Sequence, residues 1–84
     1  MSDIPAWSEA AQSFQPGIYR HFKGNEYRIF SVARHSETLE ELVVYESLTH
    51  PDRIWVRPLA MFLENVSRDG YEGPRFTPII ETEN

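Results

Sequence analysis

The stretch GIYRHFKGNEYRIFSVARHSETLEELVVYES, residues 17–47, decides the fold. It contains three runs rich in aromatic and β-branched residues, which favour β-strands, at residues 17–22, 26–35 and 41–47. Gly24-Asn25 between the first two runs predicts a two-residue hairpin turn, because glycine adopts a positive φ without strain. The segment SETLE, residues 36–40, predicts a second hairpin. Three antiparallel strands, adjacent in chain order, are therefore expected.

The charges along the second hairpin indicate how its two strands pair. A register with an ion pair at each end encloses an apolar centre, and each such pair contributes about 0.2–1 kcal/mol. A slip by one residue would move the apolar side chains to the other face of the sheet. The expected cross-strand pairs are Arg34 with Glu40, Val32 with Leu42, Phe30 with Val44, and Arg28 with Glu46.

Shorter elements are expected on either side of this stretch, since hydrophobic spacing and turn residues mark their bounds. They are a helix with Trp7, Ala11 and Phe14 on one face, ended by Pro16-Gly17; a fourth strand at 54–58; a helical turn at 59–63; and, after a turn at Asp69-Gly70, a fifth strand at 71–76.

Both faces of the second and third strands carry large apolar side chains. One face holds Phe30 and Val32, and the other holds Tyr27, Ile29, Val43 and Tyr45. In a five-stranded unit of this size, this pattern favours a small, strongly bent barrel of the SH3-like kind over a flat open sheet. The expected fold is all-β: a five-stranded SH3-like barrel with a short N-terminal helical segment. The expected boundaries are 1–14 for the N-terminal segment, 15–80 for the single barrel domain and 81–84 for a frayed tail.

The composition excludes several classes of protein. The chain has 84 residues, a formal net charge of -5 and no cysteine. Without cysteine there is no disulfide, thiolate metal site, iron–sulfur cluster or cysteine nucleophile. No apolar run approaches the ~18 residues that a membrane span needs, and the N-terminus lacks the basic and apolar regions of a signal peptide. A cytoplasmic protein that does not bind membranes is expected.

Few residues indicate catalysis. No serine lies in a glycine-flanked elbow, and no glycine lies in a phosphate-binding frame. The sequence therefore favours a protein that is not an enzyme and needs no cofactor. The alternative is a small-molecule enzyme or metal-binding protein centred on His21, His35 and Glu37, although this set lacks a recognisable metal-ligand spacing. The simpler interpretation of His35 is that it hydrogen-bonds the backbone of its own turn.

Aromatic and cationic side chains alternate along the first and fourth strands, so that they share a face. The predicted ligand-binding surface consists of Tyr19, His21, Lys23, Tyr45, Trp55 and Arg57. Small barrels use such surfaces to bind peptides, nucleotides or single-stranded nucleic acid by stacking and cation–π contact. Two alternatives stay open for Trp55: it covers an open end of the barrel, or it is buried between the subunits of a weak homodimer.

Three motifs connect the chain with a known family. They are YRHFKG at 19–24, ARHSETLEELVVY at 33–45 and WVRPLAMF at 55–62. With them, residues 15–78 resemble a bacterial family known as domain of unknown function 1653. The resemblance implies a small, free-standing, β-rich cytoplasmic protein of bacteria with no assigned activity. The family pattern favours an acid at Arg28 and a base at Glu46, which fits a cross-strand pair with its charges exchanged, and it favours an aromatic residue at Thr49.

Overall fold

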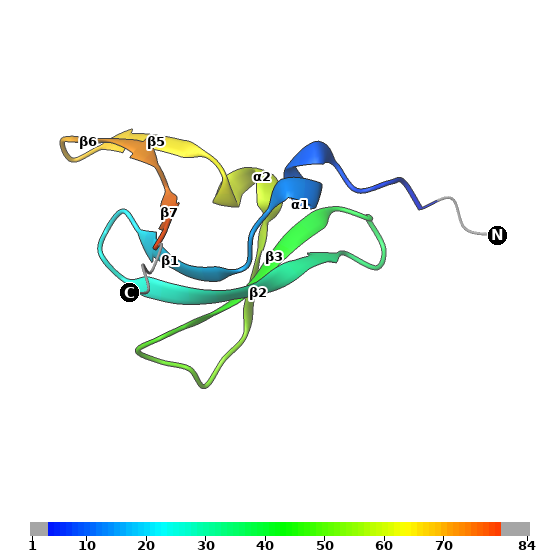
Figure 1. Cartoon of the computed structure of the whole chain (residues 1–84), viewed down its shortest axis with the longest axis horizontal. Helices are drawn as coiled ribbons and strands as arrows, with labels where there is room; N and C mark the ends of the chain where they lie inside the picture. Colours follow the sequence, from blue (N-terminus) through cyan, green and yellow to red (C-terminus); the bar gives the residue numbers. More distant parts are fainter. Residues whose placement is uncertain (1–3, 80–84) are drawn as a thin grey trace, which may run out of the picture.

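The computed structural model describes residues 4–79, in which seven strands and two short helices follow one another (Figure 1). In chain order they are α1 (Glu9–Ser13), β1 (Gly17–His21), β2 (Glu26–Arg34), β3 (Glu41–Ser47), β4 (Trp55–Pro58), α2 (Leu59–Phe62), β5 (Asn65–Arg68), β6 (Tyr71–Pro74) and β7 (Phe76–Pro78). The expectation of a mostly β chain is confirmed. Within the described range, no helix is long and apolar enough to cross a membrane. The predicted tail at 81–84 lies outside that range.

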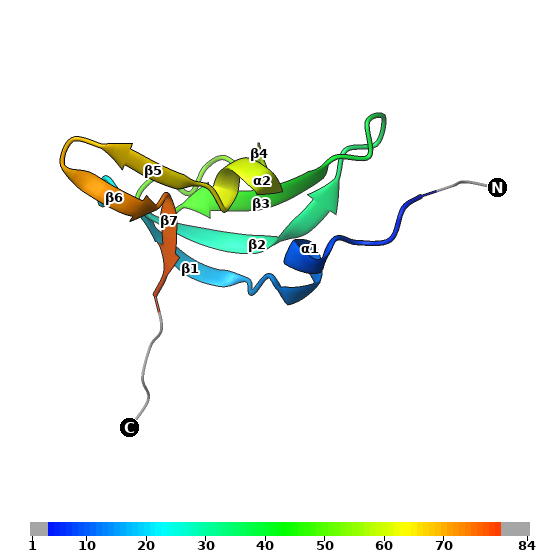
Figure 2. The ribbon, with the colours of Figure 1, turned by 90° about the horizontal axis from the view of Figure 1, so that it is seen from above.

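The main sheet is open, whereas a barrel was expected. Its five strands are antiparallel in the order β4-β3-β2-β1-β7, and its edge strands β4 and β7 do not pair with each other within residues 4–79. The α2 helix and the separate β5–β6 hairpin lie over one face of this sheet (Figures 1 and 2). In a closed barrel, the strands themselves would enclose the apolar inner face. Here α2 and the β5–β6 hairpin cover that face, so the main sheet is open. The SH3-like arrangement stays a prediction.

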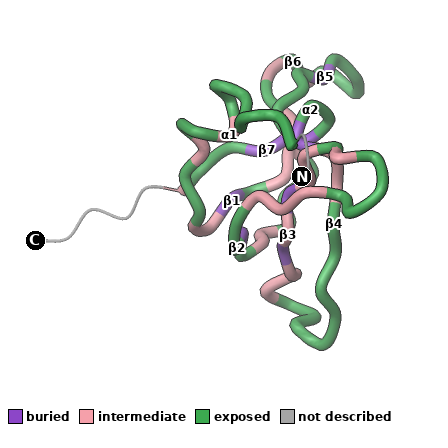
Figure 3. The backbone as a smooth tube through the Cα atoms, turned by 90° about the vertical axis from the view of Figure 1, so that its right-hand side faces the viewer, coloured by how far each residue is buried: buried purple, intermediate pink, exposed green. Residues whose placement is uncertain are grey.

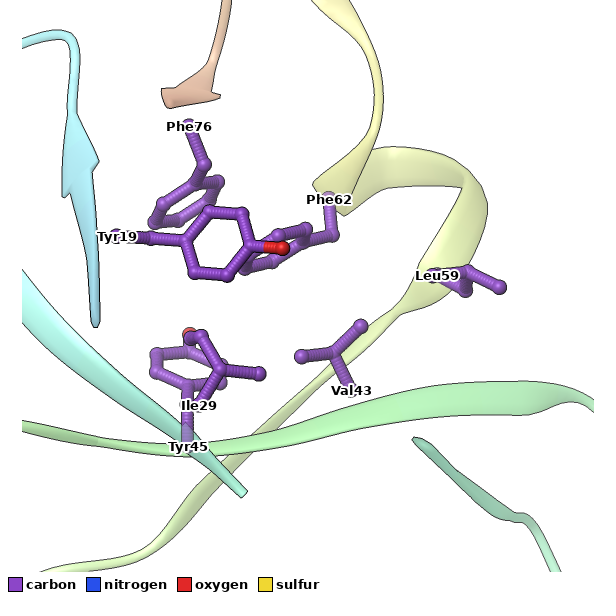
Figure 4. Close-up of a cluster of buried hydrophobic side chains, with 7 residues drawn as sticks. All are labelled: Tyr19, Ile29, Val43, Tyr45, Leu59, Phe62 and Phe76. Carbon is purple, nitrogen blue, oxygen red and sulfur yellow. The ribbon is translucent and has the colours of Figure 1, made fainter. Parts of the chain in front are cut away.

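The core lies between the inner face of the main sheet and the elements that cover it, and Figure 3 shows buried positions on both sides. Its clustered side chains are Tyr19, Ile29, Val43, Tyr45, Leu59, Phe62 and Phe76 (Figure 4). Phe76 of β7 stacks on Phe62 of α2 with the ring centroids 4.1 Å apart. The α2 helix confirms the helical turn predicted at 59–63. The contact between Phe62 and Phe76 packs this helix against β7 of the main sheet.

A β-bulge corrects the predicted register of β2 and β3. Arg28 lies opposite Glu46 as predicted, with Arg28 Nε 3.3 Å from Glu46 Oε2. Between Ile29 and Ser31 the register shifts, because Phe30 is an extra residue on β2, and every later partner is displaced by one position. Three predicted pairs are therefore wrong: Arg34 with Glu40, Val32 with Leu42, and Phe30 with Val44. The observed pairs are Arg34 with Glu41, Val32 with Val43, and Ser31 with Val44.

The β1–β2 turn has three residues, where two were predicted. The His21 N–H donates to the Asn25 carbonyl at 2.8 Å, so the loop consists of Phe22, Lys23 and Gly24. The Gly24 N–H donates to the His21 carbonyl at 2.7 Å, and Gly24 has a φ of 111°. Three-residue hairpin loops place a residue of positive φ at this position, which explains the glycine.

The predicted fifth strand is two strands. The turn predicted before it is confirmed, because Asp69 and Gly70 have φ values of 54° and 80°. After this turn β6 pairs with β5, and beyond Arg75 the chain continues as β7, which pairs with β1. The sequence did not predict β5, because Val66 is its only buried residue and the rest of the strand is polar.

The N-terminal segment is attached to the sheet through α1. A short helix was predicted here, but it is shorter than expected, because Trp7 precedes its N-cap and Phe14 is its C-cap. The Ser8 Oγ caps this helix by accepting the Ala11 N–H at 3.0 Å. The Ser8 N–H and hydroxyl also donate to the Glu41 carboxylate, at 2.8 and 2.7 Å. Further along, Phe14 stacks on Tyr19 and so extends the core.

Candidate functional site

The candidate site is a hollow of about 490 Å³ beside the edge strand β4, which we call the Trp55 hollow. Trp55 on β4 lies opposite Tyr45 on β3, so both side chains project from the inner face of the sheet. The Tyr27 ring of β2 contacts the Tyr45 ring edge-on, with the centroids 5.5 Å apart. The full lining is Asn25, Tyr27, Tyr45, Ser47, Thr49, His50, Asp52, Arg53 and Trp55. Three aromatic rings and a set of polar side chains thus surround the hollow.

The loop between β3 and β4 supplies one wall of the hollow. The Ser47 Oγ accepts hydrogen bonds from the N–H groups of Thr49 and His50, both at 3.2 Å, and this turns the chain at the end of β3. After the loop, Trp55 begins the edge strand with 48% of its surface exposed. A half-exposed indole on the wall of a hollow can present a flat ring to a ligand.

A second group of side chains gathers elsewhere on the inner face, around His21. We define the His21 cluster as His21, Lys23, Arg57, Arg68 and Arg75. The His21 ring contacts Phe76 edge-on at a centroid distance of 4.9 Å, and the Arg57 guanidinium lies 5.6 Å from the centroid of the same ring. Burial, and then the charges of the four cationic neighbours, lower the pKa of His21 below its ordinary value. His21 is therefore neutral at neutral pH, and its Nδ1 accepts the Lys23 N–H at 3.1 Å.

Carboxylates neutralise only part of this cluster. Arg75 pairs with Glu64 at 3.0 Å, whereas Lys23, Arg57 and Arg68 have no carboxylate partner among residues 4–79. The Arg57 Nε is also buried and has no hydrogen-bond partner in the described part of the chain. Among the described residues, positive charge without a carboxylate partner is thus concentrated at one place, in a protein whose formal net charge is -5.

Four of the six predicted surface residues belong to these two groups in accessible positions. Trp55 is exposed in the hollow, and Lys23 is exposed in the β1–β2 turn. His21 and Arg57 are partly buried, and both project from the inner face, opposite Phe76 and Val43 respectively. The alternation predicted along β1 and β4 therefore does bring these side chains to one side of the sheet.

The two predicted tyrosines are core residues, each 7% exposed. Tyr45 still lines the Trp55 hollow with part of its ring. The Tyr19 hydroxyl donates to the Gln15 carbonyl at 2.6 Å, and burial raises the pKa of Tyr19. Tyr19 lies outside both the hollow and the cluster, so its contacts are those of a structural residue.

The alternative set of His21, His35 and Glu37 does not converge. His21 ends β1 beside the start of β2, whereas His35 follows the far end of β2, roughly 30 Å away at about 3.3 Å per residue. The His35 Nδ1 accepts the N–H groups of Glu37 and Thr38 at 3.0 and 3.2 Å, which is the turn-bracing role predicted for it. In the range that the structure describes, no group of three or more metal-ligating side chains could hold an ion.

Sequence reasoning missed part of both groups, namely Asn25, Tyr27, Ser47, Thr49, His50, Asp52 and Arg53 of the hollow and Arg68 and Arg75 of the cluster. Tyr27 could have been predicted, because pairing Arg28 with Glu46 places Tyr27 opposite Ser47 at the end of β3. Arg75 was not, since it approaches His21 only through the distant pairing of β7 with β1. Thr49, the position at which the resemblance implies an aromatic residue, lies in the lining of the hollow.

Known proteins similar to this chain support the family resemblance. The family described as protein of unknown function (DUF1653) matches residues 17–78. A crystal structure of a DUF1653 protein from Bordetella bronchiseptica is similar with a TM-score of 0.78 and 35% sequence identity, and the match covers 89% of this chain and 99% of that chain. No curated protein matches the chain. The resemblance carried by the three sequence motifs is confirmed.

Proposed function

This chain belongs to the DUF1653 family of proteins of unknown function, and on that premise we propose that it is a non-catalytic binding module of the bacterial cytoplasm whose ligand enters the Trp55 hollow. The observation that carries this proposal is the half-exposed Trp55 ring, which stands with Tyr27 and Tyr45 around an open hollow. Tryptophan and tyrosine are enriched among the residues that dominate binding energies, because they offer a large contact area at a small cost in entropy.

The chemistry of the hollow favours a nucleobase as the bound group. Stacking of a base on an aromatic side chain contributes about 1–3 kcal/mol. The side chains of Asn25, Ser47 and Thr49 can both donate and accept hydrogen bonds, as the edge of a base requires. Asp52 and Arg53 pair with each other at 3.7 Å, so the hollow itself has little net charge. A nucleotide or a single-stranded nucleic acid therefore suits it better than a strongly charged small molecule.

The free edge of β4 favours a peptide as a second candidate ligand. Ile54 and Val56 are each 58% exposed beside Trp55, and within residues 4–79 β4 pairs with β3 alone. An extended peptide, or β4 of a second copy, can add to such an edge through main-chain hydrogen bonds. This ligand would engage the backbone of β4 rather than the rings of the hollow.

An amide NMR titration separates these candidates. We expect thymidine and a short oligothymidylate to shift the Trp55 indole signal and the amides of Asn25 and Ser47. Trp55→Ala should abolish these shifts, whereas Trp7→Ala is the matched control, because Trp7 is similarly exposed at 43% but lies outside the hollow.

Other outcomes of the titration count against the nucleobase. Slowed amide exchange along β4 with an extended apolar peptide, without shifts from thymidine, would assign the surface to the second candidate. Light scattering that gives a dimer, together with slowed exchange along β4 at high protein concentration, would make β4 a homodimer edge.

A further inference from the structure

Three cations of the His21 cluster, Lys23, Arg57 and Arg68, lie over aromatic rings. The Lys23 Nζ and the Arg68 guanidinium lie 6.0 and 5.9 Å from the centroid of Phe22, and this ring stacks on Tyr71 at 5.4 Å. Arg57 lies over Phe76 in the same way. An aromatic face positions a cation without neutralising it. The positive groups are therefore placed by packing, and their charge remains available to an anion.

The electrostatics of the cluster favour an anionic ligand. Four cations surround His21, and their charges disfavour a further proton on its ring. With Nδ1 accepting from Lys23, the neutral ring carries its proton on Nε2 and so has a donor left. Guanidinium, ammonium and imidazole N–H groups are the donors that bind phosphate oxygens in proteins. A phosphate at this place would relieve repulsion that the folded chain now contains.

Two elements join the cluster to the Trp55 hollow. On β4, Trp55 and Arg57 project from the same face two residues apart, about 6–7 Å along the strand. In the β1–β2 turn, Lys23 stands two residues from Asn25, which lines the hollow. A ligand with a base in the hollow thus reaches these cations with an attached phosphate.

We propose that the His21 cluster binds backbone phosphates of a single-stranded nucleic acid, one base of which stacks in the Trp55 hollow. This inference rests on the proposed function and extends it by naming the polymer and the residues that contact its backbone. Lys23, Arg57 and Arg68 make the phosphate contacts, and Arg75 adds positive charge while it stays paired with Glu64.

The salt dependence of binding tests this assignment. For single strands the slope of log K against log salt is about −0.7 per phosphate contact, so three contacts predict a loss of affinity of about 20-fold between 50 and 200 mM salt. Lys23→Gln should reduce this loss to about 7-fold, and Arg57→Gln should do the same. The probe is a fluorescein-labelled oligothymidylate of about eight nucleotides, measured by anisotropy.

A matched control is available on the outer face of β1. Arg20 is paired there with Glu26 at 2.8 Å and lies outside the cluster, so Arg20→Gln removes the same charge and should leave the slope unchanged. Lys23 is exposed, so Lys23→Gln remains informative even where Arg57→Gln, whose guanidinium is packed on Phe76, loses its fold. Equal slopes for Lys23→Gln, Arg20→Gln and the unaltered chain would overturn the proposal.

Two fragments of the nucleotide distinguish a failure of this inference from a failure of the proposed function. Inorganic tripolyphosphate should shift the amides of His21, Lys23 and Arg57, and thymidine should shift Trp55. Signals that shift with thymidine but not with tripolyphosphate would overturn the phosphate site and still support binding in the Trp55 hollow. Tripolyphosphate shifts without thymidine shifts would support the phosphate site and refute the hollow. Binding of oligoglutamate, without binding of oligothymidylate, would assign the cluster to an acidic protein partner and overturn the proposal.

Discussion

Replacing Trp55 by alanine should cost much less stability than replacing a core phenylalanine, because Trp55 stands on the wall of a hollow. Full burial of an aromatic side chain removes ~150–250 Å² from water, so Trp55, at 48% exposed, buries roughly 100 Å². At about 25 cal/mol per Å² the truncation costs up to ~2.5 kcal/mol. Compact unfolded chains lower that figure to about 2 kcal/mol.

Phe62 provides the comparison. It is 1% exposed and stacks on Phe76, so Phe62→Ala should cost about 3–5 kcal/mol through lost burial and a cavity. A domain of 84 residues has a total stability of about 4–12 kcal/mol. Trp55→Ala should therefore stay folded and unfold cooperatively, whereas Phe62→Ala removes a larger share of the stability, and all of it if the total lies at the low end of that range.

Urea unfolding followed by circular dichroism measures both changes. For a small domain the free energy of unfolding falls by about 1–3 kcal/mol per molar urea, so a loss of about 2 kcal/mol lowers the midpoint by about 1 M. A loss for Trp55→Ala as large as that for Phe62→Ala would show that Trp55 is a core residue. That result would refute the reasoning on which the hollow is treated as a binding site.

Three further predictions concern charges. Arg28→Glu and Glu46→Arg should each cost up to about 1 kcal/mol in urea unfolding, and the double variant should regain most of it, because the residues pair across β2 and β3; additive losses would contradict the register. In an NMR pH titration the pKa of His21 should lie below its ordinary value, and Arg57→Gln should raise it, because this change removes a repelling charge. Since the unfolded chain binds the His21 proton more readily than the folded chain, the free energy of unfolding should fall as the pH drops below about 6.5. Hydrogen bonds from the Ser8 side chain, and then from the Ser8 backbone, lower the pKa of Glu41 in the folded chain. These bonds should therefore stabilise the fold above about pH 4.3, and this stabilisation should be lost as the pH falls through the lower pKa of the folded chain. Hydrogen exchange should then become faster at the amides of α1, and Glu41→Gln should weaken that pH dependence.

Local sequence patterns predicted most of the strands because their signals are short-range. The runs that became β1 to β4 are marked by alternation and turn residues, and the Arg28–Glu46 pair was found from charge alone. The bulge at Phe30 was not, because an extra residue in one strand leaves the alternation on each side intact. The open sheet was also missed, because the two apolar faces on which the barrel prediction rested are not observed. The bulge brings Val32 to the same face as Val43, where it packs against the core, and Phe30 stays 41% exposed.

The sequence predicted residues of the candidate site only where aromatic and cationic side chains alternate along one strand. Trp55 and Arg57 were found together because they alternate on β4. Arg75 was not found, because it meets His21 through contacts between the two ends of the described chain. Tyr19 was misjudged as a surface residue, since an aromatic residue on a strand looks the same in sequence whether it points into a core or a ligand.

The most direct test of the central claim is the fluorescence of Trp55 during a titration with oligothymidylate. Trp7→Phe leaves Trp55 as the remaining tryptophan of the chain while keeping an aromatic ring where Arg34 stacks. If a base stacks on the indole in the hollow, we expect saturable quenching that follows the same binding curve as the labelled oligonucleotide. Saturable binding of the labelled oligonucleotide with unchanged Trp55 emission, or no binding at all, would contradict the account.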